Sequence, residues 1–534
     1  MSSTATLYHE QAAPPARGRR TALPPSLRHV LIVGGGTAGW MTALTLGRSL
    51  LDQGVRITLV ESPSIGTIGV GEGSTPWLRG FFDSLGIDES QWMPACHATY
   101  KCGISFAGWS SKPGFERYFH PFASMLDNLT MTQFVHNCDA RVNGADVHAH
   151  PDRFFLAALL AQRGLAPKPA AHFPFDIWHG YHFDAVLLGA FLQREALRRG
   201  VHHRAGHVTH ANLDAHGNLS SVGIEGAEPL AADLFVDCSG FAALLIERAL
   251  KTPFVSFAEN LFNDAAVALP SPIGERIPSE TLSTALGHGW AWRIPLSERF
   301  GNGYVYSSQF CTADQAEQEL RAHLGLLDAD VPARHLRMRI GRATRHWHRN
   351  CVAIGLSGGF IEPLEATALL SIQQTAALFV ECLERGDLSD TAQESFNTQV
   401  NEHYEGIRDY IVAHYKTSSR ICYGVLARQP RQPQRVRTAQ AAPQPVDERQ
   451  GHRARRAPAA AGPRLPRVPV VSAARRDVPE AGQLPAPQGR EAAYRMGEID
   501  DLLARSAANS REHRAVLEAV PPRRRGESLQ VYFW

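Results

Sequence analysis

A short apolar run followed at once by a glycine-rich turn is the feature that most constrains the fold of this chain. Residues His29–Val33 are suited to a strand buried on both faces, and the segment 34–39 (GGGTAG) follows directly. A helical stretch runs from Trp40 to about Leu51, and a second strand over residues 55–60 ends at Glu61. This order predicts a βαβ unit, and therefore an α/β fold that begins near residue 28.

The glycine spacing in this unit is typical of a dinucleotide-binding turn. Gly34 permits the tight turn, Gly36 lets the backbone approach a pyrophosphate, and Gly39 packs the helix on the strand. The N–H groups that open the helix favour phosphate oxygens, and an acid after the second strand suits a ribose hydroxyl. The predicted cofactor-binding residues are Gly34, Gly36, Thr37, Ala38, Gly39 and Glu61.

Two later segments favour FAD over NAD as the dinucleotide. Residues 233–240 (DLFVDCSG) and 351–355 (CVAIG) each read as a strand that ends in a glycine turn, and the second leads to a helix near residue 366. In flavoproteins of the monooxygenase type, a late helix start of this kind faces the flavin ring. Gly355 therefore joins the predicted cofactor site.

Hydrophobic periodicity predicts further helices at 154–163, 184–199, 366–385 and 390–415, with short strands over much of 200–310. The predicted fold class is α/β. We expect an FAD-binding Rossmann-like domain of the flavin monooxygenase type, intimately joined to a largely helical substrate-side region.

Charge and composition exclude several kinds of partner. Lys plus Arg total 54 and Asp plus Glu total 52, and this balance argues against a nucleic-acid partner. No uncharged apolar run approaches the ~18 residues that suggest a membrane span. Eight cysteines in a chain of 534 residues do not make a disulfide scaffold, which favours a cytoplasmic location.

Four motifs occur in order along the chain: GGGTAGW at 34–40, GVGE at 69–72, GWAWRIP at 289–295 and EPLEAT at 362–367. Over about residues 28–420 the chain resembles the flavin-dependent tryptophan halogenase-like family. The resemblance implies that a separate NADH-dependent flavin reductase supplies reduced FAD, which with O2 and a halide ion gives hypohalous acid. This acid passes through a tunnel to a lysine, and a small electron-rich aromatic, such as an indole or tryptophan derivative, is halogenated by electrophilic substitution. A homodimer is compatible with it.

The resemblance assigns two catalytic residues. Lys101 follows the segment 92–94 (WMP) and matches the family lysine, which donates a hydrogen bond to hypohalous acid or forms a haloamine when neutral. Glu365 matches the family carboxylate, which stabilises the cationic ring and takes its proton. Glu362 of the same motif is the second candidate for this role, because the register of the motif matches Glu365 to the family carboxylate.

The same resemblance assigns the halide and substrate pockets. Thr367 and Ala368 match the backbone positions that bind halide, and Ala368 stands where the family has Gly, which predicts a preference for bromide over chloride. Trp290 and Trp292 would separate the flavin from the substrate, while His120 and Phe122 resemble its ring-stacking positions.

No metal site is predicted. His346 and His348 have no third ligand beside them, so a structural role is the favoured interpretation.

The sequence divides into four parts. They are a disordered N-terminal extension (1–27), the FAD-dependent halogenase domain with a discontinuous FAD-binding part (28–427), an Arg/Pro/Ala-rich low-complexity segment (428–493), and a C-terminal helix and tail (494–534). Residues 428–493 contain no Phe, Tyr, Trp or Ile. They are interpreted as a natural disordered tail or as the product of a reading-frame error, and we favour the error. Codons for 423–433 can be chosen so that the shifted frame encodes TGYWHANPANP, which resembles a folded segment far more closely.

The C-terminal part of the family holds the ammonium and carboxylate of an amino acid, and no counterpart is visible here. A substituted indole, another electron-rich arene or a peptide-borne ring therefore fits as well as free tryptophan. Two rival functions stay open at this stage: a flavin-dependent aromatic monooxygenase, and a catalytically impaired FAD-binding remnant.

Overall fold

A six-stranded sheet carries the βαβ unit that the sequence predicts. The computed structural model describes residues 27–66, 71–419 and 496–520. The strand order is β21-β22-β13-β1-β2-β9, and all pairs are parallel except β21 with β22. The strands are β1 (His29–Val33), β2 (Arg56–Glu61), β9 (His202–Ala205), β13 (Leu234–Asp237), β21 (Trp347–His348) and β22 (Cys351–Ala353). Every residue of β1 is buried, as expected for a central strand of a parallel sheet.

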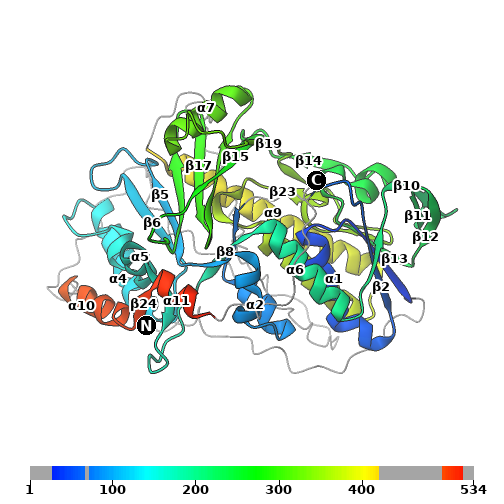
Figure 1. Ribbon diagram of the computed structural model, residues 1–534, viewed down its shortest axis with the longest axis horizontal. Coiled ribbons are helices and arrows are strands. Elements are labelled where there is room, and N and C mark those ends of the chain that lie inside the picture. Colours follow the sequence, from blue (N-terminus) through cyan, green and yellow to red (C-terminus); the bar gives the residue numbers. More distant parts are fainter. Residues whose placement is uncertain (1–26, 67–70, 420–495, 521–534) are drawn as a thin grey trace, which may run out of the picture.

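Three predicted helices pack together beside this sheet. Helix α1 (Thr37–Leu50) lies against α6 (Ala185–Arg198) and α8 (Ala368–Glu384). The side chain of Asp184 caps α6 by accepting hydrogen bonds from the N–H groups of Val186 and Leu187. Figure 1 shows α1 and α6 side by side next to β2 and β13, and the long helix α9 (Asp390–Thr417) between this part and the other large sheet.

The other large sheet has seven strands in the order β19-β15-β18-β17-β16-β5-β6. They are β5 (Gly103–Ala107), β6 (Arg117–Pro121), β15 (Ala265–Pro272), β16 (Thr281–Ala285), β17 (Gly289–Pro295), β18 (Arg299–Tyr306) and β19 (Arg334–Arg337). The sequence predicted strands over much of 200–310 but not the pairing of β16 with β5, which come from distant parts of the chain. The substrate side therefore contains a large sheet, which carries the GWAWRIP motif on β17, in addition to the expected helices.

Smaller sheets complete the fold. A three-stranded sheet of β3 (Gly71–Gly73), β8 (Gly180–Asp184) and β4 (Thr99–Lys101) packs against β17 and β18 of the seven-stranded sheet and, through β8, against α6. The remaining strands are β7 (Leu165–Pro169), β10 (Val208–Leu213), β11 (Leu219–Ile224), β12 (Ala227–Ala231), β14 (Phe254–Ser256), β20 (Gly341–Ala343) and β23 (Gly359–Phe360). The remaining helices before residue 419 are α2 (Trp77–Leu85), α3 (Glu89–Trp92), α4 (Asn128–Val142), α5 (Leu156–Arg163) and α7 (Ala313–Leu324). Within the described ranges, no helix combines the length and the apolar character that crossing a membrane requires.

The single helix predicted in the C-terminal part (494–534) is interrupted in the structure. The structure has α10 (Met496–Ala507), a short strand β24 (Ser510–Glu512) and α11 (His513–Ala519). Strand β24 pairs with β7, so backbone hydrogen bonding to a distant strand replaces helical hydrogen bonds at this point. The predicted parts 1–27 and 428–493 lie, apart from Leu27, outside the described residues.

Candidate active site

The glycine-rich turn after β1 has the geometry of a phosphate cradle. Gly34 has φ +115°, and a Cβ there would lie 2.1 Å from the carbonyl oxygen of Cys238. Gly36 is the N-cap of α1, no side chain caps this helix end, and a Cβ on Gly36 would meet nothing within 4 Å. The first N–H groups of α1, including those of Thr37 and Ala38, therefore keep room for an anion. These features fit the pyrophosphate of FAD.

Two further predicted cofactor residues lie beside this turn. A Cβ on Gly35 would lie 1.5 Å from Oε2 of Glu61, so the acid at the end of β2 stands directly against the turn. Its Oε1 lies 2.9 Å from Nε2 of His203. Gly355 has φ +81°, and a Cβ there would lie 2.7 Å from the Cβ of Ala38. The fold thus brings the late glycine turn, which follows β22, to the start of α1.

Substituting the two turn glycines by Ala is expected to give different results. Gly34→Ala introduces a clash with backbone and an unfavourable φ, so we expect a lower unfolding temperature as well as loss of FAD. A Cβ at Gly36 would meet open space in the protein, so we expect an unchanged unfolding temperature for Gly36→Ala. We expect its FAD binding to be at least about tenfold weaker, a loss of about 1.4 kcal/mol of binding free energy. Thermal unfolding without FAD and a fluorescence titration with FAD measure the two effects. Unchanged FAD affinity in Gly36→Ala would contradict the cradle.

Lys101 is a buried amine with an unusual environment. It ends β4, is 0% exposed, and its Nζ has no hydrogen-bond partner within the described residues. The Nζ lies 5.3 Å from the centre of the Phe122 ring. Burial lowers the pKa of Lys101 to about 8, although the charge of Glu365 raises it in part. A buried amine without a hydrogen-bond partner can bind a small polar oxidant.

Glu365 ends a short 3-10 turn before α8, and two imidazoles flank it. It is 5% exposed, and its Oε2 lies 3.0 Å from Nδ1 of His120 on β6. Its Oε1 lies 3.0 Å from Nε2 of His414 on α9. Burial raises the pKa of Glu365, but His120 and His414 outweigh this and hold the pKa well below its usual range. The carboxylate is therefore ionised and available as a base.

Glu362, the second carboxylate of the motif, has a different environment. It is 0% exposed, and Nδ2 of Asn263 donates to its Oε2 at 2.7 Å and to the hydroxyl oxygen of Tyr415 at 2.8 Å. Burial raises the pKa of Glu362 to about 7, against the hydrogen bonds from Tyr415 and Asn263. Glu362 is thus partly protonated at neutral pH, which favours Glu365 as the general base.

The predicted halide residues open α8. Thr367 is the N-cap, its side chain makes no capping hydrogen bond, and no acidic residue occurs in the first turn. The N–H groups there are therefore left for an anion. Ala366 has φ +55°, which turns the backbone sharply between Glu365 and the helix.

The two tryptophans of the GWAWRIP motif lie on one face of β17. Trp290 is 2% exposed and Trp292 is 7% exposed, and their ring centres are 6.2 Å apart. A Cβ on Gly303 of the neighbouring strand β18 would lie 2.1 Å from the Trp292 ring, so the missing side chain makes room for this indole. The pair therefore forms a bulky, buried aromatic cluster on this strand.

Sequence reasoning missed His414 and Tyr410 of α9. The Tyr410 hydroxyl lies 3.2 Å from Nδ1 of His120. Tyr410 and His414 are four residues apart, which places both on one face of the helix. This spacing is the sequence feature that could have indicated them. His346 is buried, and the described part of the chain contains no cluster of three or more metal-ligating side chains.

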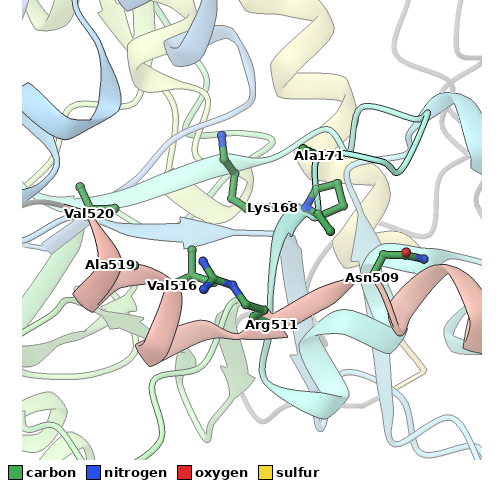
Figure 2. Close-up of a pocket in the computed structure, with 9 residues that line it drawn as sticks. Lys168, Ala171, Asn509, Arg511, Val516, Ala519 and Val520 are labelled. Carbon is green, nitrogen blue, oxygen red and sulfur yellow. The ribbon is translucent and has the colours of Figure 1, made fainter.

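A surface hollow is formed by the end of β7 and the residues that follow α10. Figure 2 shows this hollow between β7 and the C-terminal segment, and it contains none of the predicted site residues. It is lined by Lys168, Pro169, Ala170, Ala171, Asn509, Arg511, Val516, Ala519 and Val520. Nearby, Nε2 of His513 accepts a hydrogen bond from the N–H of Tyr100 at 3.1 Å. The C-terminal segment therefore supports β4 from outside the candidate site.

Comparison with known proteins agrees with this arrangement. The family model described as tryptophan halogenase matches residues 29–424. The tryptophan 6-halogenase of Streptomyces toxytricini is 40% identical over 418 residues, which cover 73% of this chain and 78% of that protein. The tryptophan 7-halogenase of Lentzea aerocolonigenes is 36% identical over 413 residues, covering 73% and 76%.

Solved structures show the same relationship. The crystal structure of the Streptomyces toxytricini enzyme has a TM-score of 0.68 at 37% identity, covering 75% of this chain and 81% of that one. A flavin-dependent halogenase from Xanthomonas campestris has a TM-score of 0.76 at 29% identity, covering 93% and 99%. The predicted Rossmann-like flavoprotein fold is thereby confirmed, and the monooxygenase and remnant alternatives are not favoured. The chain belongs to the tryptophan halogenase family of FADH2-dependent halogenases.

Proposed function

We propose that this enzyme halogenates an electron-rich aromatic ring of the indole or tryptophan class. The single observation that carries the proposal is the buried, unpaired amine of Lys101 together with the ionised carboxylate of Glu365. The relatives named above act on tryptophan, and the aromatic side chain of Phe122 beside Lys101 suits a planar ring.

The residues divide the chemistry between them. Bound reduced FAD, with O2 and halide, supplies hypohalous acid. Lys101 takes up the electrophilic halogen, either through a hydrogen bond or as a haloamine, and presents it to the ring. Glu365 stabilises the positive charge on the ring and removes the proton from the halogenated carbon. Trp290 and Trp292 keep the ring away from the flavin.

An assay with the purified chain tests this function. It contains FAD, NADH, an NADH-dependent flavin reductase, bromide, and either indole or tryptophan. A product with the bromine isotope pattern supports the proposal, whereas a hydroxylated product or none would contradict it. Omission of the reductase is expected to abolish turnover, which tests the proposed partner. We propose that the enzyme is cytoplasmic, and size-exclusion chromatography of the same preparation tests the homodimer.

The halide preference is a separate proposal that rests on Ala368. The family has Gly at this position, and the Cβ of Ala restricts the backbone conformations that are available beside the halide. We expect mainly brominated product when bromide and chloride compete at equal concentration. Ala368→Gly is expected to raise the chlorinated fraction about threefold, the ratio that ~0.6 kcal/mol represents. Mass spectrometry of the products measures this fraction, and mainly chlorinated product from the natural sequence would contradict the preference.

We also propose that the halogenase domain spans residues 28–427. Helix α9 ends at Thr417 and the family match ends at residue 424, close to the point where the composition changes. The segment 428–493 lies outside the described residues. Resequencing the gene tests the proposed frame error, because an intact frame that encodes the written residues would contradict it.

A further inference from the structure

Glu365 has a second imidazole beside it that none of the sequence motifs contains. Nε2 of His414, on the last turns of α9, lies 3.0 Å from Oε1 of Glu365. His120 contacts the other oxygen from β6, also at 3.0 Å. The carboxylate therefore lies 3.0 Å from each of two imidazoles that come from different elements of the fold.

The His414 ring is fixed by aromatic packing. It stacks on Phe106 of β5 with ring centres 5.1 Å apart and an interplanar angle of 21°, and it meets the Tyr410 ring edge-on at 5.0 Å. The His414 side chain is 13% exposed, compared with 5% for Glu365. Nε2 itself is buried, so this exposure belongs to the rest of the ring, which connects His414 with solvent.

We propose that His414 is a positioning residue that orients Glu365 and takes over the proton that Glu365 removes from the substrate. This inference rests on the proposed function. The C–H bond of the halogenated carbon breaks, its electron pair restores the aromatic ring, and the proton forms an O–H bond on Glu365. That O–H bond then breaks as Nε2 of neutral His414, whose own proton is on Nδ1, accepts the proton. The carboxylate is restored, the imidazolium releases its Nδ1 proton to water, and the neutral ring returns to the Nδ1–H tautomer before the next turnover.

The two imidazoles have different tasks. Burial lowers the pKa of His120, but the charge of Glu365 outweighs this and leaves the pKa raised, so His120 holds its own proton more tightly. A protonated His120 orients and stabilises the carboxylate but accepts no further proton. His414 is the remaining imidazole in contact with Glu365 in the described residues.

The other titratable groups that face this site are poor proton acceptors. Tyr118 on β6 and Tyr410 on α9 have pKa values raised above their usual range by burial, and by the charge of Glu365, so both keep their protons. The charge of Glu365 raises the pKa of Lys101 on β4, but in the proposed function this amine receives the halogen and not the proton. The proton therefore leaves through His414.

Single-turnover kinetics with pre-reduced FAD tests this role, using indole and ring-deuterated indole. In the natural enzyme we expect equal rates for the two substrates, because proton removal is fast. His414→Gln keeps a hydrogen-bonding group but cannot take up the proton. We expect its rate to fall about tenfold, with a clear isotope effect, since proton transfer becomes the slow step.

A matched control is His335→Gln, which removes the imidazole of another pair, where Nε2 lies 2.8 Å from Oε2 of Glu317. We expect its rate and isotope ratio to equal those of the natural enzyme. Added imidazole is expected to restore part of the rate of His414→Ala, a rescue that loss of packing alone would not allow. FAD titration and thermal unfolding show that the variants are folded.

The outcomes separate this inference from the function on which it rests. Absence of a halogenated product from both indole and tryptophan with the natural enzyme would overturn both. Halogenation by the natural enzyme, together with an unchanged rate and isotope ratio in His414→Gln and no imidazole rescue of His414→Ala, would overturn the relay alone.

Discussion

Lys101→Ala is expected to abolish halogenation, by roughly 10³-fold or more, and to leave FAD binding intact. The amine is buried beside Phe122 and has no hydrogen-bond partner in the described structure, and Ala at this position has no nitrogen to receive the halogen. FAD binding is expected to persist because β4 is not part of the six-stranded sheet. Product formation by liquid chromatography and FAD retention by absorbance measure the two quantities.

The matched control is Lys112→Ala, which changes an exposed lysine and is expected to retain full activity. Retained product formation in Lys101→Ala would refute the assignment. Loss of FAD in that variant would show instead that the substitution disturbs the fold.

The activity that depends on Lys101 is also expected to vary with pH. Burial lowers the pKa of this amine to about 8, so below pH 8 the ammonium form predominates. If the neutral amine forms a haloamine, the single-turnover rate rises about tenfold from pH 6 to pH 7 and levels above pH 8. We expect this profile. A rate that falls as the pH passes through 8 would instead assign the ammonium, as a hydrogen-bond donor, as the active form.

Glu365→Gln has the second largest expected effect, a fall in rate of roughly 10²- to 10³-fold. The amide keeps the size of the side chain and its contacts with His120 and His414, but it neither accepts the proton nor stabilises the cationic ring. Single-turnover halogenation of indole with pre-reduced FAD measures this loss.

Glu362→Gln provides the comparison within the same motif. Glu362 is already partly protonated near neutral pH, and Asn263 donates to it, so the amide resembles its natural state. We expect a much smaller loss of rate than for Glu365→Gln. An equal or larger loss would transfer the general-base role to Glu362.

The local features of the fold were predictable from the sequence because they depend on neighbouring residues. The run at His29–Val33, the turn at 34–39 and Glu61 are close in the chain, and the structure has the strand, helix and acid in that order. The helices at 184–199 and 390–415 were also predicted within a few residues of α6 and α9. The C-terminal helix was not, because β24 pairs with β7, and the periodicity of a segment does not report a distant strand.

By itself, the sequence determined the βαβ unit, its glycine turn and the order of the family motifs, since these are local patterns and residue identities. Only the tertiary structure decided which carboxylate is ionised. Glu362 and Glu365 are three residues apart, yet one packs against Asn263 and Tyr415 while the other contacts His120 and His414. The charge of a carboxyl group depends on its burial and on the charged groups that contact it. For Glu365 these groups come from β6 and α9, which are far from Glu365 in the sequence.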